Sequence, residues 1–197
     1  MPPADDIQRQ LVAAWQLMNG RREAMRLLDV SADGFWNSFF AILVAMPVLV
    51  VGWVPLANAA FPDSTISERI GVMVRIAMVD IGAWVLPIVV LALVARHIGI
   101  RDRFVHFVVA SNWGSALFAW FMLPASLLRL VFPGTDELAL VLSLGIFLAS
   151  LVLSWRLTNA SLEKGPGVAS GVFGAMLLAS LLVLFALQDL LGVAPVQ

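Results

Sequence analysis

Asp80 has the clearest chemical potential in this sequence, because its carboxyl group belongs to a long apolar stretch. No charged residue occurs between Asp80 and Arg96. An ionisable group within a membrane-spanning segment is costly, which makes Asp80 a candidate for a functional site. It needs water, a hydrogen-bond donor from a neighbouring span, or a proton. Three interpretations remain open: a buried acid with a structural role, a proton or ion site, and a contact with a partner protein.

Arg75 and Asn112 complete this predicted intramembrane polar site. Arg75 precedes Asp80 by five positions, and at about 100° per residue their side chains point about 140° apart, so we expect no pairing between them on a straight helix. Arg75 can instead extend to the membrane surface. Asn112 is flanked by small residues, and we expect it to form hydrogen bonds across helices, with a substrate pocket as the alternative.

The remaining residue types exclude most catalytic chemistry. The chain has no Cys, so thiol catalysis and cysteine-ligated metals are excluded, and His97 and His106 are its two histidines. Neither a nucleophile elbow, nor a zinc-protease motif, nor a phosphate-binding loop occurs. We therefore predict a protein that is not an enzyme and has no metal and no cofactor. The net charge of −1 argues against nucleic acid as a partner.

The elements that must position these residues are membrane-spanning helices. Hydrophobic residues make up 61% of the 197 residues and charged residues 13%, against about 25% charged in a typical soluble domain. Gaps between charges are long enough for helices of about 20 residues. The sequence therefore predicts an all-α integral membrane bundle, with a lead over 1–33, a five-helix domain over 34–190 and a short tail over 191–197. The predicted spans are 36–57, 76–96, 104–124, 137–156 and 168–189.

The distribution of basic residues predicts the orientation. With Arg75 set aside, nine basic residues fall on the side of the N-terminus and two, Arg69 and Arg129, on the other. Lys and Arg are enriched on the cytoplasmic side of membrane proteins. We therefore expect a multi-pass protein of a cell inner membrane, with a cytoplasmic N-terminus and a periplasmic C-terminus.

Residues 5–28 are predicted to form an amphipathic region at the inner membrane face. Ile7, Leu11, Trp15 and Met18 recur at helical spacing, and Gly20 interrupts the pattern. The alternative is a cytoplasmic helix packed on the bundle's own loops. Basic residues here and in the loop between the second and third spans are predicted to contact lipid headgroups or a partner; they are Arg21, Arg22, Arg26, Arg96, Arg101 and Arg103.

Local signals predict where several helices begin. Asp33 is expected to cap the first span, and Thr65 with Glu68 forms a predicted capping box that starts the second helix well before its apolar core. Thr135 is expected to cap the fourth span. Trp53 is predicted to lie at the outer membrane interface.

Small residues recur at every fourth position of the fifth span. Such a ridge lets helices approach closely, either within the chain or between two chains, so the chain is a candidate homo-oligomer. The ridge consists of Gly167, Gly171, Ala175 and Ala179.

Short motifs along the spans resemble the Yip1 family of small five-span membrane proteins. The first span opens with Gly34-Phe35-Trp36-Asn37-Ser38-Phe39-Phe40, and the second contains Trp84-Val85-Leu86-Pro87. Gly99, Phe104 and Asn112-Trp113 follow, and Leu123-Pro124 ends the core of the third span. The resemblance covers about residues 34–190. It implies a five-span membrane protein and carries over no catalytic residue.

Three functions follow as hypotheses. The first is a membrane-organising or scaffold protein, Yip1-like, whose partners are the lipid bilayer and a second copy or another membrane protein. The second is a small transporter or channel that uses Asp80, aided by Asn112, and it predicts a water-accessible cavity reaching Asp80. The third is an accessory subunit of a larger membrane complex.

Overall fold

The computed structural model describes residues 2–60, 65–132 and 134–193. Helices take up 84% of the described residues, and no β-strand occurs in these ranges, which confirms the predicted all-α fold. Residues 194–197 of the predicted tail lie outside the described residues. The elements are α1 (Ala4–Met18), the 3₁₀ helix η1 (Arg22–Leu27), α2 (Ala32–Ser38), α3 (Phe40–Ala60), α4 (Ile66–Val94), α5 (Phe104–Val131), α6 (Asp136–Leu162) and α7 (Pro166–Leu190).

Five helical segments are long and apolar enough to cross a membrane: α2 with α3 over Ala32–Asn58, and then α4, α5, α6 and α7. Each contains the predicted span or most of it. With 29 residues, α4 is about 43 Å long, whereas the hydrocarbon core of a bilayer is about 30 Å thick. The helices therefore extend past the lipid core, and the chain is a multi-pass membrane protein.

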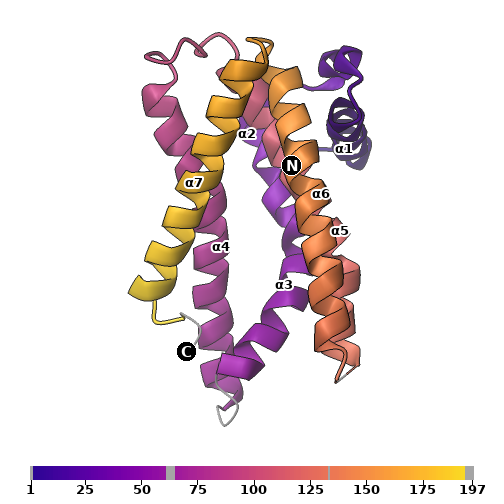
Figure 1. Cartoon of the computed structure of the whole chain (residues 1–197), viewed down its shortest axis with the longest axis vertical. Coiled ribbons are helices and arrows are strands. Elements are labelled where there is room, and N and C mark those ends of the chain that lie inside the picture. Colours follow the sequence, from indigo (N-terminus) through magenta and orange to yellow (C-terminus); the bar gives the residue numbers. More distant parts are fainter. Residues whose placement is uncertain (1, 61–64, 133, 194–197) are drawn as a thin grey trace.

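The two ends of the bundle carry different connections. The α4–α5 and α6–α7 connections lie at the upper end in Figure 1, and α1 and α2 lie toward that end. The C-terminal ends of α3, α5 and α7 lie at the opposite end. We call these the upper and lower ends below; the upper one is the end predicted to be cytoplasmic.

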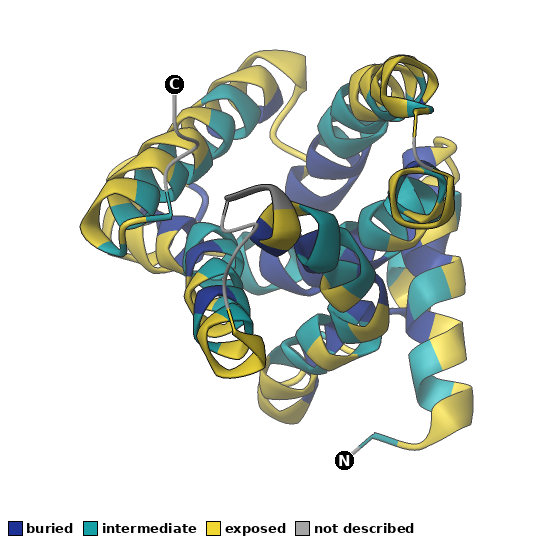
Figure 2. Ribbon diagram, turned by 90° about the horizontal axis from the view of Figure 1, so that it is seen from below, coloured by how far each residue is buried: buried dark blue, intermediate teal, exposed yellow. Residues whose placement is uncertain are grey.

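Contacts between neighbouring helices link the five spans in a ring. α3 packs on α5, α5 on α6, α6 on α7, α7 on α4, and α4 on α3. α5 also contacts α1 and α2, and α6 also contacts α1 and η1. Exposed residues cover the outward sides of the helices in Figure 2. Leu93, Val141 and Leu182 are among many apolar side chains there, as expected of a surface that meets lipid.

Two of the three predicted helix starts needed correction. The capping box of Thr65 and Glu68 is present, which confirms that prediction. Asp33 does not cap α2; Ser31 does, since its Oγ accepts a hydrogen bond of 3.0 Å from Gly34 N. Asp33 lies in the first turn of α2, where its charge still favours the positive helix end. Thr135 occupies the N-cap of α6, but its hydroxyl donates to carbonyl oxygens at the end of α5, so no capping bond forms.

The lead packs on the bundle through most of the predicted apolar stripe, together with neighbouring alanines and Leu17. α1 lies roughly at right angles to the long axis of the bundle, as comparison of Figures 1 and 2 shows, and contacts α5 and α6. Its buried residues are Gln10, Ala13, Ala14, Leu17 and Met18. Of the predicted stripe, Met18 is buried, and Ile7 and Leu11 are partly buried against the same core. Trp15 is the exception, since it is 44% exposed and packs edge-on against Phe121. Alanines and Gly114 allow the close approach, and this leaves the large indole at the rim.

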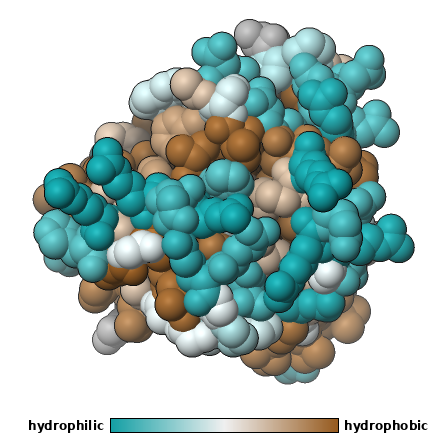
Figure 3. Space-filling model, turned by 90° about the horizontal axis from the view of Figure 1, so that it is seen from above, coloured by the Kyte–Doolittle hydropathy of each residue, from teal (hydrophilic) through white to brown (hydrophobic). Residues whose placement is uncertain are grey.

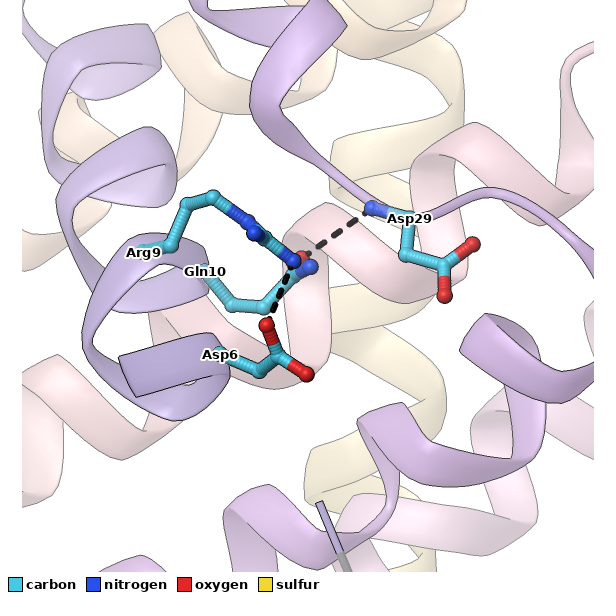
Figure 4. A network of polar contacts seen from close by, with 4 residues as sticks. All are labelled: Asp6, Arg9, Gln10 and Asp29. Carbon is cyan, nitrogen blue, oxygen red and sulfur yellow. Dashed lines mark hydrogen bonds and ion pairs between the residues drawn. The ribbon is translucent and has the colours of Figure 1, made fainter. Parts of the chain in front are cut away.

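Polar contacts join α1 to the segment that precedes α2 (Figure 4). Arg9 pairs with Asp6 at 2.7 Å, and the backbone N–H of Asp29 donates to Gln10 Oε1 at 3.3 Å. Hydrogen bonds from Ser31 and, to a smaller extent, the positive charge of Arg9 hold the pKa of Asp29 below its usual 3.8. Gly34 packs so closely on Asp29 that a Cβ at this position would collide with its backbone oxygen. The lead is therefore held by a specific fit as well as by apolar contact.

Candidate functional site

Asp80 lies half-buried on α4 and points toward α3. Trp53 Nε1 donates a hydrogen bond of 2.6 Å to Asp80 Oδ2. This is the donor from a neighbouring span that the sequence required. Trp53 is 5% exposed, so its indole packs inside the bundle, and its predicted level at the outer membrane interface stays a prediction. Its indole N–H serves a carboxylate inside the bundle instead of the polar membrane surface.

Arg75 takes no part in this site. Its side chain is exposed, and among the described residues it forms no ion pair. This agrees with the expected 140° separation of the two side chains on one helix. Of the two predicted intramembrane charges, the structure therefore places Asp80 inside the bundle and Arg75 on its surface.

A cavity of about 460 Å³ lies within the ring of five helices, and Asp80 lines it. Divided by the roughly 30 Å³ that a water molecule occupies in liquid, this volume corresponds to about fifteen waters. Side chains from all five spanning segments line this inner cavity. Its hydroxyl groups come from three helices: Ser111 and Ser115 of α5, Ser150, Ser154 and Thr158 of α6, and Ser180 of α7.

The hydroxyl groups of the inner cavity fall into two groups. Ser150 and Thr158 donate back to carbonyl oxygens of their own helix. In the part of the chain that the structure describes, four others form no side-chain hydrogen bond, although none is fully buried; they are Ser111, Ser115, Ser154 and Ser180. Hydroxyls that face a cavity without a protein partner are suited to bind water or a polar solute.

A second cavity, of about 790 Å³, lies toward the lower end of the bundle. It is lined by the second halves of α3 and α5 and the first turns of α6, including Asn58, Arg129 and Asp136. Asp80 lines this outer cavity as well. The residues shared by both cavities are Leu49, Asp80, Ala119 and Met122, and we call them the junction.

Apolar side chains close the inner cavity toward the upper end. A buried cluster there includes Leu91, Ile100, Phe107, Leu162 and Val172, contributed by α4 to α7 and the α4–α5 connection. Ile100 and Leu162 have no exposed surface. The arrangement is therefore a carboxylate at the junction of two cavities, with polar side chains lining the outer cavity toward the lower end and a buried apolar cluster at the upper end.

Asn112 forms the hydrogen bonds across helices that the sequence predicted. Its Nδ2 donates to Ser38 Oγ at 2.9 Å, and its Oδ1 accepts from Trp84 Nε1 at 3.0 Å. Asn112 has no exposed surface and does not line the inner cavity, whereas Trp84 does. Asn112 therefore links α2, α4 and α5 and holds a wall of the cavity in place, rather than offering a pocket of its own.

The basic residues of the predicted headgroup contact lie toward the upper end. Figure 3 shows hydrophilic side chains spread over this face. Arg103 pairs with Glu163, and Lys164 pairs with Asp102 at 2.8 Å, so these ion pairs join the α4–α5 connection to the end of α6 and the turn after it. The pair with Lys164 lowers the pKa of Asp102. The others are exposed: Arg21, Arg22, Arg26, Arg96 and Arg101.

The small-residue ridge of α7 does not pack on another helix of the chain. Gly167, Gly171 and Ala175 are exposed, and a Cβ added at either glycine would meet nothing within 4 Å. Instead, α7 buries Ala169 and Val172. The within-chain seam is therefore not formed by these residues, and contact between two chains, which also involves Ala179, stays a prediction.

The sequence reading missed most of the inner cavity. Serines in separate spans give no recognisable motif, because their shared cavity depends on helix rotation. His106 Nδ1 is buried and has no hydrogen-bond partner among the described residues. No group of three His, Cys, Asp or Glu side chains that could hold a metal occurs among the described residues. Comparison with models of protein families, with curated proteins and with solved structures finds no match to this chain.

Proposed function

We propose that this protein is a small transporter of cationic solutes or protons, with Asp80 as the binding carboxylate. The observation that carries the proposal is that Asp80 lines both cavities of the bundle. The negative charge of a carboxylate inside a membrane domain has to be stabilised by water, by a hydrogen-bond donor or by a cation. Asp80 accepts one hydrogen bond from the protein, from Trp53, and it lines two cavities in which it could contact a solute.

The walls of the inner cavity favour a small cation with an apolar body. Aromatic rings attract cations through their faces, and hydroxyls replace part of a hydration shell. Both rings and hydroxyls line the cavity, with Phe118, Phe147 and Phe173 among the rings. The apolar cluster at the upper end gives a closed gate, so the described arrangement corresponds to a state open toward the lower end. Access to the inner cavity from the upper end then requires α4 and α7 to move away from α5 and α6 at that cluster.

We assign this protein to an inner membrane, with its upper end in the cytoplasm and no enzymatic activity. The nine basic residues on the side of the N-terminus support the orientation. The carboxylate of Asp80 is bonded to an indole rather than to a histidine or a second acid, which suits binding better than proton-transfer catalysis.

Flux into proteoliposomes tests the transport proposal. Vesicles with an imposed membrane potential, negative inside, are loaded with a proton-sensitive dye or given radiolabelled methylammonium or tetraethylammonium. We expect flux of at least one of these probes above that of empty vesicles, and its loss in Asp80→Asn. Asp189→Asn is the matched control, because Asp189 is an exposed acid that lines neither cavity. Absence of flux for every probe, or equal flux in Asp80→Asn, would overturn the proposal.

A Yip1-like membrane-organising role is the second proposal, and the position of the lead favours it. α1 lies across the bundle, and Val12 and Trp15 are 42% and 44% exposed, as suits insertion at a membrane surface. We expect the reconstituted protein to reduce the mean diameter of anionic vesicles, and Trp15→Ala to weaken that effect. Unchanged vesicle diameter at high protein content would contradict this role.

A further inference from the structure

A small pocket separate from the Asp80 cavities lies where the lead meets α6. Its volume is about 200 Å³, and it is lined by Gly20, Arg22, Trp155, Arg156, Asn159 and Ala160. Three side chains that can donate hydrogen bonds, two of them guanidinium groups, therefore face one small space. No acidic residue is among those that line it.

Close packing of the lead on α6 places Arg156 in this pocket. Gly20 has φ +86°, and a Cβ there would lie 2.8 Å from an Arg156 guanidinium nitrogen. Gly20 is thus needed both for the turn after α1 and for the approach of this side chain. Arg22, two residues on, begins η1. The turn therefore sets the two arginines side by side although they lie 134 positions apart in the sequence.

Neither arginine is neutralised by the protein. Among the described residues, Arg22 and Arg156 form no ion pair, in contrast to Arg9, Arg103 and Lys164. The Asn159 side chain likewise has no hydrogen-bond partner in the described part of the chain. Trp155 adds an aromatic wall, and its Nε1 is occupied by Ser170 Oγ at 2.9 Å. Paired guanidinium groups without an acid are suited to a phosphate, which accepts bonds from both.

We propose that Arg22, Arg156 and Asn159 form a binding site for a phosphate group, supplied by an anionic phospholipid of the leaflet at the upper end. The tryptophans of this region favour a lipid, because Trp155 lines the pocket and α1, which ends two residues before Gly20, exposes Trp15. Tryptophan prefers the headgroup level of a bilayer. A bound headgroup would join the lead to α6 and so brace the upper end of the bundle.

Lipid binding to the purified full-length protein tests this site. Native mass spectrometry in detergent counts phosphatidylglycerol and phosphatidylcholine bound per chain, with inorganic phosphate as a competitor. We expect one tightly held phosphatidylglycerol per chain and a Kd raised about tenfold or more in Arg22→Gln/Arg156→Gln. The matched control is Arg21→Gln/Arg26→Gln, which removes the same charge from exposed positions of the lead outside the pocket.

Each outcome decides the question. Equal weakening in both double variants means diffuse attraction to basic side chains and overturns the site. If the wild-type protein shows no preference for phosphatidylglycerol over phosphatidylcholine, a lipid is not the source of the phosphate. If inorganic phosphate then binds only when both arginines are present, the site still binds phosphate. Arg156→Lys retains the charge while losing the planar fork, so unaltered binding in this milder variant also contradicts the proposed geometry.

Discussion

Replacing Asn112 should destabilise the bundle by breaking a connection between three helices. Asn112→Leu keeps the approximate volume of the side chain but removes the bonds to Ser38 Oγ and Trp84 Nε1. Side-chain hydrogen bonds between membrane helices contribute about 0.6 kcal/mol on average and up to about 1.7 kcal/mol each. Losing both should therefore lower the free energy of unfolding by about 1–3 kcal/mol.

Unfolding in mixed micelles with rising dodecyl sulfate measures this loss, and a double-mutant cycle with Trp84→Phe isolates one bond. We expect a coupling free energy of about 0.6 kcal/mol between positions 84 and 112, because the second mutation removes a bond that the first has already broken. Asn37→Leu, the same change at an exposed asparagine of α2, should have little effect. The reasoning is refuted if Asn112→Leu is as stable as the wild type and the coupling is zero.

Three further predictions concern the lead and the orientation. Gly34→Ala should loosen the lead, because the new Cβ collides with the backbone of Asp29. Trypsin should then cleave the variant faster at Arg21, Arg22 and Arg26. The control Gly145→Ala has open space around the new Cβ and should be cleaved at the rate of the wild type. Because the pKa of Asp29 is lowered in the folded protein, ionised Asp29 stabilises the fold. This contribution to the free energy of unfolding is complete above pH 3.8 and is lost as the pH falls through the lower folded pKa. Hydrogen exchange of the lead, corrected for intrinsic rates, should therefore rise below pH 3.8 in the wild type but not in Asp29→Asn; a flat wild-type profile would contradict it. In intact cells, an impermeant thiol reagent should label Leu191→Cys and not Arg101→Cys, and the reverse pattern would overturn the orientation.

The helices were predictable because their signals are local. Long gaps between charges define the spans, and the Thr65–Glu68 pair marks the start of α4 through contacts within one turn. Cap positions were harder, since Ser31, Asp33 and other polar residues compete within a few positions. Ser31 takes the cap because Gly34 must lie against Asp29, a contact that only the folded lead supplies.

The site was predictable as far as Asp80 and Asn112, because polar groups in apolar segments need partners. Which partners they have depends on helix rotation and packing, which one sequence does not specify. Trp53 was therefore predicted only as an interface residue, although it donates a hydrogen bond to Asp80 from the neighbouring helix α3. The ridge on α7 likewise has the spacing of a packing seam, but the helix turns Val172 inward in its place.

Water access to the inner cavity, which Asp80 lines, tests the central claim most directly. The natural chain has no cysteine, so a single thiol can be introduced at Ser115, which lines the inner cavity, and compared with one at Leu148, which is 53% exposed on the outer surface of α6. Thiols react as thiolates, which form in water and not in lipid. In membranes, Ser115→Cys should react with a small water-soluble thiosulfonate while Leu148→Cys stays unmodified. An unreactive Ser115→Cys beside a reactive Leu148→Cys would contradict a water-filled cavity at Asp80.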